Sequence, residues 1–132
     1  MSGDHLFVYG TLRRDTGSEM HRIVAHNGEF LGGATLQGKL YRVGFYPGLV
    51  PSEDPRDIVY GEVYKLRRPD FVLSVLDGYE ECGPRFREPA FIRREQAVKF
   101  KSGEVMSAWV YIFARPTKAL QIIKSGDFLS KS

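Results

Sequence analysis

Cysteine, long apolar runs and charge of one sign are all scarce in this chain of 132 residues. The single cysteine, Cys82, cannot close an internal disulfide, which favours a reducing compartment. No apolar run approaches the roughly 20 residues needed to cross a bilayer. The first residues, Met-Ser-Gly-Asp-His, show no signal-peptide pattern. We therefore expect a cytoplasmic protein without membrane association.

Basic stripes and metal-binding patterns are also missing. The formal net charge is +3, and the arginine pairs at 13–14, 67–68 and 93–94 are scattered along the chain. A nucleic-acid-binding barrel is therefore disfavoured, because such proteins usually gather their basic residues on one face. The three histidines show no zinc spacing with the lone cysteine, so we expect no metal site. The mild positive charge does suit a small anionic ligand.

The residues that are present predict one globular domain over residues 1–132. Hydrophobic residues make up 42% of the chain and charged residues 27%, a balance typical of folded proteins. The length suits a single domain with a real core. No repeat or linker divides it, and only the tail, about 126–132, is expected to fray.

Several segments have strand patterns. Residues 6–9 form a short buried run, and "IVYGEVYKL" alternates, with Val59, Gly61 and Val63 on one face. "EFLGGATLQGKLYRV" is predicted as two strands interrupted by glycines, and "FYPGLVPSEDPRD" as a loop. "AFIRREQAVKF" and "VMSAWVYIF" are predicted as a pair of strands with a turn around Ser102-Gly103. Glycines inside strands favour a curved sheet or a small barrel, which can hold one ligand at an open end.

Two or three short helices are expected beside these strands. Residues 15–27 are compatible with a weak helix. A stronger one begins at Pro69 and ends at Gly78, with an apolar stripe at helical spacing. This stripe consists of Phe71, Val72, Val75 and Leu76. The segment that opens with Pro116 is compatible with a C-terminal helix.

The first candidate site is Tyr9-Gly10-Thr11-Leu12, where a strand ends in a glycine turn. Without a Cβ atom, Gly10 allows backbone N–H groups to approach a ligand, and consecutive N–H groups can form an anion site. A simple turn that ends the strand is the alternative, and the tetrapeptide taken alone favours it. The binding turn stays open as the second interpretation.

The second candidate site is the acidic segment 77–82, "DGYEEC", at the end of the predicted helix. A carboxylate beside a helix C-terminus and an apolar side chain has its protonated form favoured, which suits a proton carrier near neutral pH. A solvated acidic turn is the alternative, and the local sequence again leaves the choice open.

Five motifs in order resemble the gamma-glutamylcyclotransferase-like family, and are most similar to its gamma-glutamylamine cyclotransferase and small bacterial branches. They are "VYGTLRR", "GFYPGLVP", "YGEVYKL", "VLDGYEE" and "AWVYIF", and they extend from about Leu6 to Phe113. The resemblance implies an α+β fold, a small mixed β-barrel with short flanking helices. It also implies an enzyme that cyclises a gamma-glutamyl group to 5-oxoproline and releases an amine or amino acid, without cofactor or metal.

The resemblance also implies roles for individual residues. Glu80, in Leu76-Asp77-Gly78-Tyr79-Glu80, matches the family's general acid/base, whereas the neighbouring Glu81 does not. Tyr9, Gly10, Thr11 and Leu12 match the loop that binds the gamma-glutamyl moiety. Tyr111 matches an aromatic residue near the pocket in relatives, although core packing explains it equally well.

The sequence departs from the family pattern where substrate selection is expected. Arg87 lies one position early, and residues 15–21 replace a Gly and Asn-His pattern of relatives. The leaving amine is therefore not predicted, and neither is the oligomeric state. The alternative function on the same fold is a non-catalytic module that binds a small metabolite or a partner protein.

Overall fold

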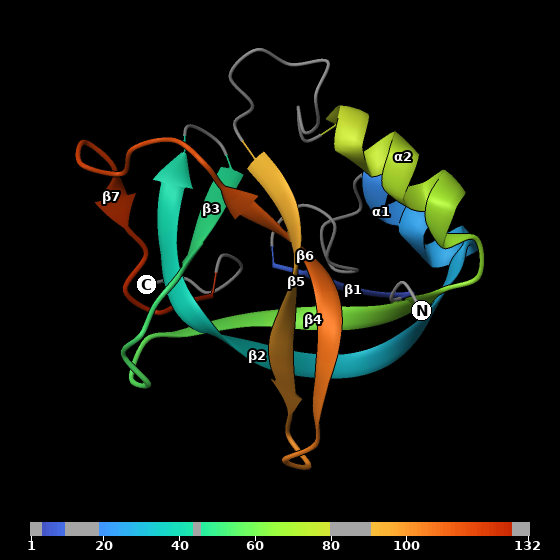
Figure 1. Ribbon diagram of the computed structural model, residues 1–132, viewed down its shortest axis with the longest axis horizontal. Helices are drawn as coiled ribbons and strands as arrows, with labels where there is room; N and C mark the ends of the chain where they lie inside the picture. Colours follow the sequence, from blue (N-terminus) through green and yellow to red (C-terminus); the bar gives the residue numbers. More distant parts are fainter. Residues whose placement is uncertain (1–3, 10–18, 44–45, 80–90, 128–132) are drawn as a thin grey trace.

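The computed structural model describes residues 4–9, 19–43, 46–79 and 91–127 of the chain. In this part of the chain, seven strands and two helices follow one another (Figure 1). They are β1 (His5–Val8), α1 (Glu19–His26), β2 (Gly28–Val43), β3 (Tyr46–Pro51), β4 (Ile58–Leu66), α2 (Pro69–Tyr79), β5 (Phe91–Phe100), β6 (Val105–Phe113) and β7 (Gln121–Ile122). Neither helix is long and apolar enough to span a bilayer.

Five of the described strands close a barrel in the cyclic order β1–β4–β2–β5–β6. The ring closes where β6 returns to β1 in parallel, with Trp109 opposite Leu6. β3 pairs with the second half of β2 and, in parallel, with β6, while β7 pairs with β2. Figure 1 shows both helices together on one side of the barrel and β7 on the other. The prediction of a small mixed β-barrel with short flanking helices is confirmed.

β2 is one continuous strand, so the predicted interruption by glycines is wrong. Its register against β4 shifts between Phe30 and Gly32, and Gly32 has a φ of 135°. L-residues rarely adopt this backbone conformation, whereas glycine does so without a steric penalty. The glycine therefore produces a β-bulge that bends the strand instead of ending it.

Two other segments differ from their predicted structure because they pair with distant residues. Tyr46–Pro51, predicted as loop, forms β3 against the second half of β2. The predicted C-terminal helix is absent from residues 117–127, where turns surround the short strand β7. The N–H of Ile123 donates to the carbonyl of Leu40 at 2.7 Å, and its side chain is buried. This pairing with β2 takes the backbone groups that a helix would have needed.

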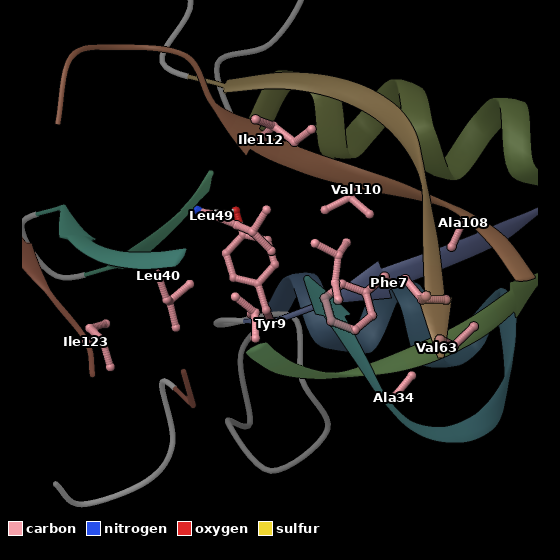
Figure 2. Packing of buried hydrophobic residues seen from close by; sticks show 13 residues of the cluster. Phe7, Tyr9, Ala34, Leu40, Leu49, Val63, Ala108, Val110, Ile112 and Ile123 are labelled. Carbon is pink, nitrogen blue, oxygen red and sulfur yellow. Dashed lines mark hydrogen bonds between the residues drawn. The ribbon is translucent and has the colours of Figure 1, made fainter. Parts of the chain in front are cut away.

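The barrel interior holds one cluster of buried side chains, called here the interior cluster (Figure 2). The alternation predicted for "IVYGEVYKL" is confirmed, because Val59 and Val63 belong to this cluster. A Cβ atom built on Gly61 would lie 2.4 Å from the carbonyl oxygen of Val8 and 2.6 Å from the Phe7 ring. The missing side chain thus lets β1 approach β4 closely. The cluster comprises Phe7, Tyr9, Ala34, Leu36, Leu40, Leu49, Val59, Val63, Val98, Ala108, Val110, Ile112 and Ile123.

A second cluster, called the outer cluster, fills the space between the barrel and the helices. From α2 it includes Val72 and Leu76, as predicted, whereas Phe71 is 47% exposed under the guanidinium of Arg68. α2 also continues through Gly78, the predicted terminator, to Tyr79. The cluster comprises Leu6, Val8, Val24, Tyr64, Leu66, Val72, Leu73, Leu76, Phe91, Tyr111 and Phe113.

Candidate functional site

Tyr9 lies directly after β1 and points into the barrel. Its side chain is buried beside Leu49 (Figure 2). The hydroxyl donates a hydrogen bond to the backbone carbonyl of Tyr111 and accepts one from the N–H of Leu49 at 3.2 Å. The end of β1 is therefore fastened to β6 and to β3 at one point.

Tyr111 lies on β6 with its side chain on the opposite side of the sheet, among the residues of the outer cluster. It is 3% exposed, and its hydroxyl donates a hydrogen bond to Oδ1 of Asp77 at 2.6 Å. The same residue accepts the hydrogen bond from Tyr9 through its backbone. Tyr111 thus contacts both segments that carry the predicted site, Tyr9 on one side and the end of α2 on the other.

Asp77, in the last turn of α2, forms a two-point ion pair with Arg93 of β5. Nε of Arg93 lies 2.8 Å from Oδ1, and Nη2 lies 3.0 Å from Oδ2. Both side chains are only about a quarter exposed, at 23% and 25%. Paired N–H···O bonds of this kind are charge-assisted and fix orientation as well as distance. The last turn of α2 is therefore held to β5 and β6 through one carboxylate.

The sheet register explains why Arg93 and Tyr111 reach the same carboxylate. The two residues stand directly opposite each other on β5 and β6, with their side chains on the helix side. The Arg93 guanidinium also lies over the ring of Trp109, 4.5 Å from its centroid. Trp109 is the diagonal neighbour across the same pair of strands. Cation–π contact adds to the ion pair in holding the guanidinium.

A buried carboxylate, Glu62, lies close to the end of β1. It is 6% exposed, stands opposite Val8 in the β1–β4 register, and points to the helix side of the sheet like Tyr64. The Tyr64 hydroxyl contacts its Oε1 at 3.5 Å, a long hydrogen bond. The alternation of "IVYGEVYKL" placed Glu62 with the tyrosines, but it gave no sign that the carboxylate is buried.

Of the predicted site residues, the structure describes Tyr9 and Tyr111 and brings them together. Gly10, Thr11, Leu12 and Glu80 lie outside the described residues, so their predicted roles stay predictions. Asp77 and Arg93 were missed as partners, because they are 16 positions apart in the sequence and only the position of α2 against β5 in the folded chain joins them. An aspartate at a helix C-terminus was the available signal, since the helix dipole disfavours it there without a cation.

A shallow groove of about 260 Å³ lies elsewhere, near β7. Arg56 on its wall is already held by Asp54, through contacts of 2.9 and 3.1 Å, and this hydrogen bonding lowers the pKa of Asp54. The groove includes neither Tyr9 nor Tyr111. Its lining residues are Gly38, Lys39, Leu40, Arg56, Asp57, Ile58, Tyr60, Ile122, Ile123, Lys124 and Ser125. In the ranges that the structure describes, no group of three or more His, Cys, Asp or Glu side chains could hold a metal ion.

Comparisons with known proteins give one family. The family model described as "Gamma-glutamyl cyclotransferase, AIG2-like" matches residues 6–130. The gamma-glutamylcyclotransferase family protein YtfP of Escherichia coli K12 is 33% identical over 127 residues, which is 96% of each chain. The solution structure of E. coli ytfP superposes with a TM-score of 0.63 at 32% identity, over 95% of this chain and 96% of that one.

Two other solved structures share the fold. YkqA of Bacillus subtilis has a TM-score of 0.71 and 25% identity over 96% of this chain, which spans only 39% of that longer protein. An AIG2-like protein of Mus musculus has a TM-score of 0.65 and 26% identity, over 86% of this chain and 79% of that one.

Proposed function

The chain belongs to the AIG2-like gamma-glutamyl cyclotransferase family, and from this premise we propose that it cyclises a gamma-glutamyl group to 5-oxoproline. The second product is an amine or an amino acid. Glu80 is the general acid/base, and residues 9–12 bind the gamma-glutamyl moiety. The substrate is a small molecule, and the reaction uses neither a cofactor nor a metal, because the nucleophile and the electrophile are tethered in one molecule.

The proposed reaction is an internal aminolysis. Glu80 takes a proton from the α-ammonium, and the freed nitrogen attacks the gamma-carbonyl carbon to form a five-membered ring. The bond from that carbon to the leaving nitrogen then breaks. The α-nitrogen gives up two protons in total, and the departing amine gains both, so that no water is consumed. Holding the substrate in the attacking conformer lowers the activation free energy by several kcal/mol, as it does in other intramolecular reactions.

One observation on the described residues supports this proposal most directly. Tyr111 accepts a hydrogen bond from Tyr9 and donates one to Asp77. Gly10 follows Tyr9 directly, and Glu80 follows Asp77 by three residues, a stretch that spans at most about 11 Å. The described residues that precede Gly10 and Glu80 therefore both contact Tyr111 of β6, which favours a shared site. Backbone N–H groups of residues 10–12 would hold the substrate carboxylate or the developing oxyanion.

The test is a panel of gamma-glutamyl compounds screened for release of 5-oxoproline by chromatography. The panel includes gamma-glutamyl amino acids, gamma-glutamylamines such as the ε-linked lysine adduct, and glutathione. Glu80→Gln keeps the shape of the side chain and removes its titrating group, so kcat should fall by about 10²- to 10⁴-fold. Glu81→Gln is the matched control and should retain wild-type turnover.

Two results would contradict the proposal in different ways. If Glu80→Gln turned over at the wild-type rate, Glu80 would have no part in proton transfer. If the wild-type protein bound a gamma-glutamyl compound in calorimetry but released no 5-oxoproline during long incubation, the non-catalytic binding module would be the correct function.

A further inference from the structure

We propose that Asp77, Arg93 and Tyr111 form a clamp that positions Glu80 for proton transfer. None of the three is assigned contact with the reacting atoms here; they act through the end of α2. The inference rests on the proposed function, because it assigns a task to residues around its general acid/base. The family resemblance suggested that Tyr111 contacts the substrate, whereas in the structure its hydroxyl donates a hydrogen bond to Asp77.

The first argument is the charge of Asp77 at this position. A carboxylate in the last turn of a helix faces the negative end of the helix dipole. Residues 76–79 contain no Lys, Arg or His that would offset it within the turn. Asp70, by contrast, lies in the first turn of the same helix, where the dipole favours negative charge. Asp77 therefore weakens α2 by itself and is favourable only when the cation of β5 holds it.

The second argument is the geometry of the contacts. The two carboxylate oxygens receive three hydrogen bonds, of 2.6, 2.8 and 3.0 Å, from side chains on two strands of the barrel. One hydrogen bond would leave the end of α2 free to rotate, whereas three hydrogen bonds from two strands fix both its distance from the sheet and its rotation. Arg93 is itself held over Trp109, so the donor is as constrained as the acceptor. The clamp thus transfers the rigidity of the barrel to the residue three positions before Glu80.

The third argument is that the clamp shares Tyr111 with the opposite segment. Tyr9 is fastened to the backbone of Tyr111 and to Leu49. Because one residue holds both segments, their separation is set by the geometry of a single position on β6. In an intramolecular reaction, displacement of a catalytic group by about 1 Å can cost on the order of 100-fold in rate. A site assembled from two distant segments of the chain has a clear use for such a common anchor.

A purely structural role and a positioning role predict different kinetics. Removing one hydrogen bond from a purely structural cluster lowers stability and leaves kcat of the folded enzyme unchanged. Removing it from a positioning clamp lowers kcat while KM changes little, because the proposed binding residues 9–12 are unchanged. A direct contact of Tyr111 with substrate would instead raise KM.

The experiment compares Tyr111→Phe and Arg93→Lys with two matched controls, Tyr60→Phe and Arg94→Lys, whose side chains are exposed. Tyr111→Phe removes a single oxygen atom, so it should fold even if Arg93→Lys does not. We expect kcat to fall about 10- to 100-fold in either clamp variant, with KM within about threefold of wild type. The controls should match wild type. Thermal unfolding confirms that each variant is folded at the assay temperature.

A double mutant separates the clamp from independent effects. Because Tyr111 and Arg93 act on one carboxylate, the loss of kcat in the double variant should be clearly smaller than the product of the single losses. Multiplicative losses would contradict the clamp. A raised KM in Tyr111→Phe would also contradict it, and so would clamp variants that are as active as their controls while Glu80→Gln is inactive. Each of these results would leave the proposed function intact. A wild-type protein with no activity on any compound would overturn both proposals together.

Discussion

The interior and outer clusters bury similar numbers of side chains but differ in chemistry. The described interior cluster is apolar except for the Tyr9 hydroxyl, and its side chains fill the barrel (Figure 2). The outer cluster contains Tyr64 and Tyr111, whose hydroxyls contact the carboxylates Glu62 and Asp77. Polar side-chain contacts therefore gather between the barrel and the helices, whereas the interior of the barrel is almost entirely apolar.

The largest effects should come from removing a fully buried leucine in each cluster. Leu49 belongs to the interior cluster and Leu76 to the outer one, and both are 0% exposed. Leu49→Ala and Leu76→Ala should each lower the free energy of unfolding by about 2–5 kcal/mol in chemical denaturation. Only Leu76→Ala should also reduce kcat at temperatures where both variants are folded, because Leu76 directly precedes Asp77. Equal kcat values for the two variants would contradict a functional difference between the clusters.

A smaller effect should follow from adding one methyl group to the interior. Gly61→Ala would place a Cβ against the backbone of Val8 and the ring of Phe7, at 2.4 and 2.6 Å. Overpacking of this kind costs about 1–3 kcal/mol of stability, measured as the shift in the denaturation midpoint. Gly33→Ala on the adjacent strand is the control, since its Cβ would come no closer than 3.8 Å to the Gly61 carbonyl. Comparable stability of the two variants would show that β1 does not need this close approach.

The smallest effect tests the one polar side chain of the interior cluster. Tyr9→Phe removes the hydroxyl and leaves the buried N–H of Leu49 without this acceptor. We expect a loss of about 1–2 kcal/mol in unfolding experiments, which is the usual penalty for an unsatisfied buried group. Tyr60→Phe, at an exposed position, should be neutral. A fully stable Tyr9→Phe variant would mean that packing alone fastens the end of β1.

Local patterns predicted those elements whose structure is decided locally. The alternation of residues 58–66 and the turn at Ser102-Gly103 were both confirmed, because each depends on neighbouring residues. The short helix within residues 15–27 was confirmed as α1. The continuous course of β2 could not be predicted in this way. Glycine in a strand can end it or bend it, and only the partner strand decides between the two.

Distant pairing explains the remaining errors, in the fold and in the site. β3 and β7 form because they pair with β2, and no local pattern of residues 46–51 or 121–122 reveals this pairing. Phe71 fits the apolar stripe by spacing, yet it lies at the margin of the buried face of α2. The resemblance to a family supplied Tyr9 and Tyr111 as site residues. It did not supply the hydrogen bond from Tyr9 to Tyr111, or the contacts of Tyr111 and Arg93 with Asp77, which depend on how β1 and α2 lie against β5 and β6 in the folded chain.

The tight bend between β5 and β6 has a consequence far beyond its own four residues. Gly103, with a φ of 93°, and two backbone hydrogen bonds between Phe100 and residues 103–104 determine which residues of the two strands stand opposite each other. Side chains alternate along a strand, so a slip by one position would turn Tyr111 inward and put Val110 in its place. An insertion at the tip of this hairpin that shifted the register by one residue would therefore remove the Tyr111 contact with Asp77 at the opposite end of the strands, without altering any residue there.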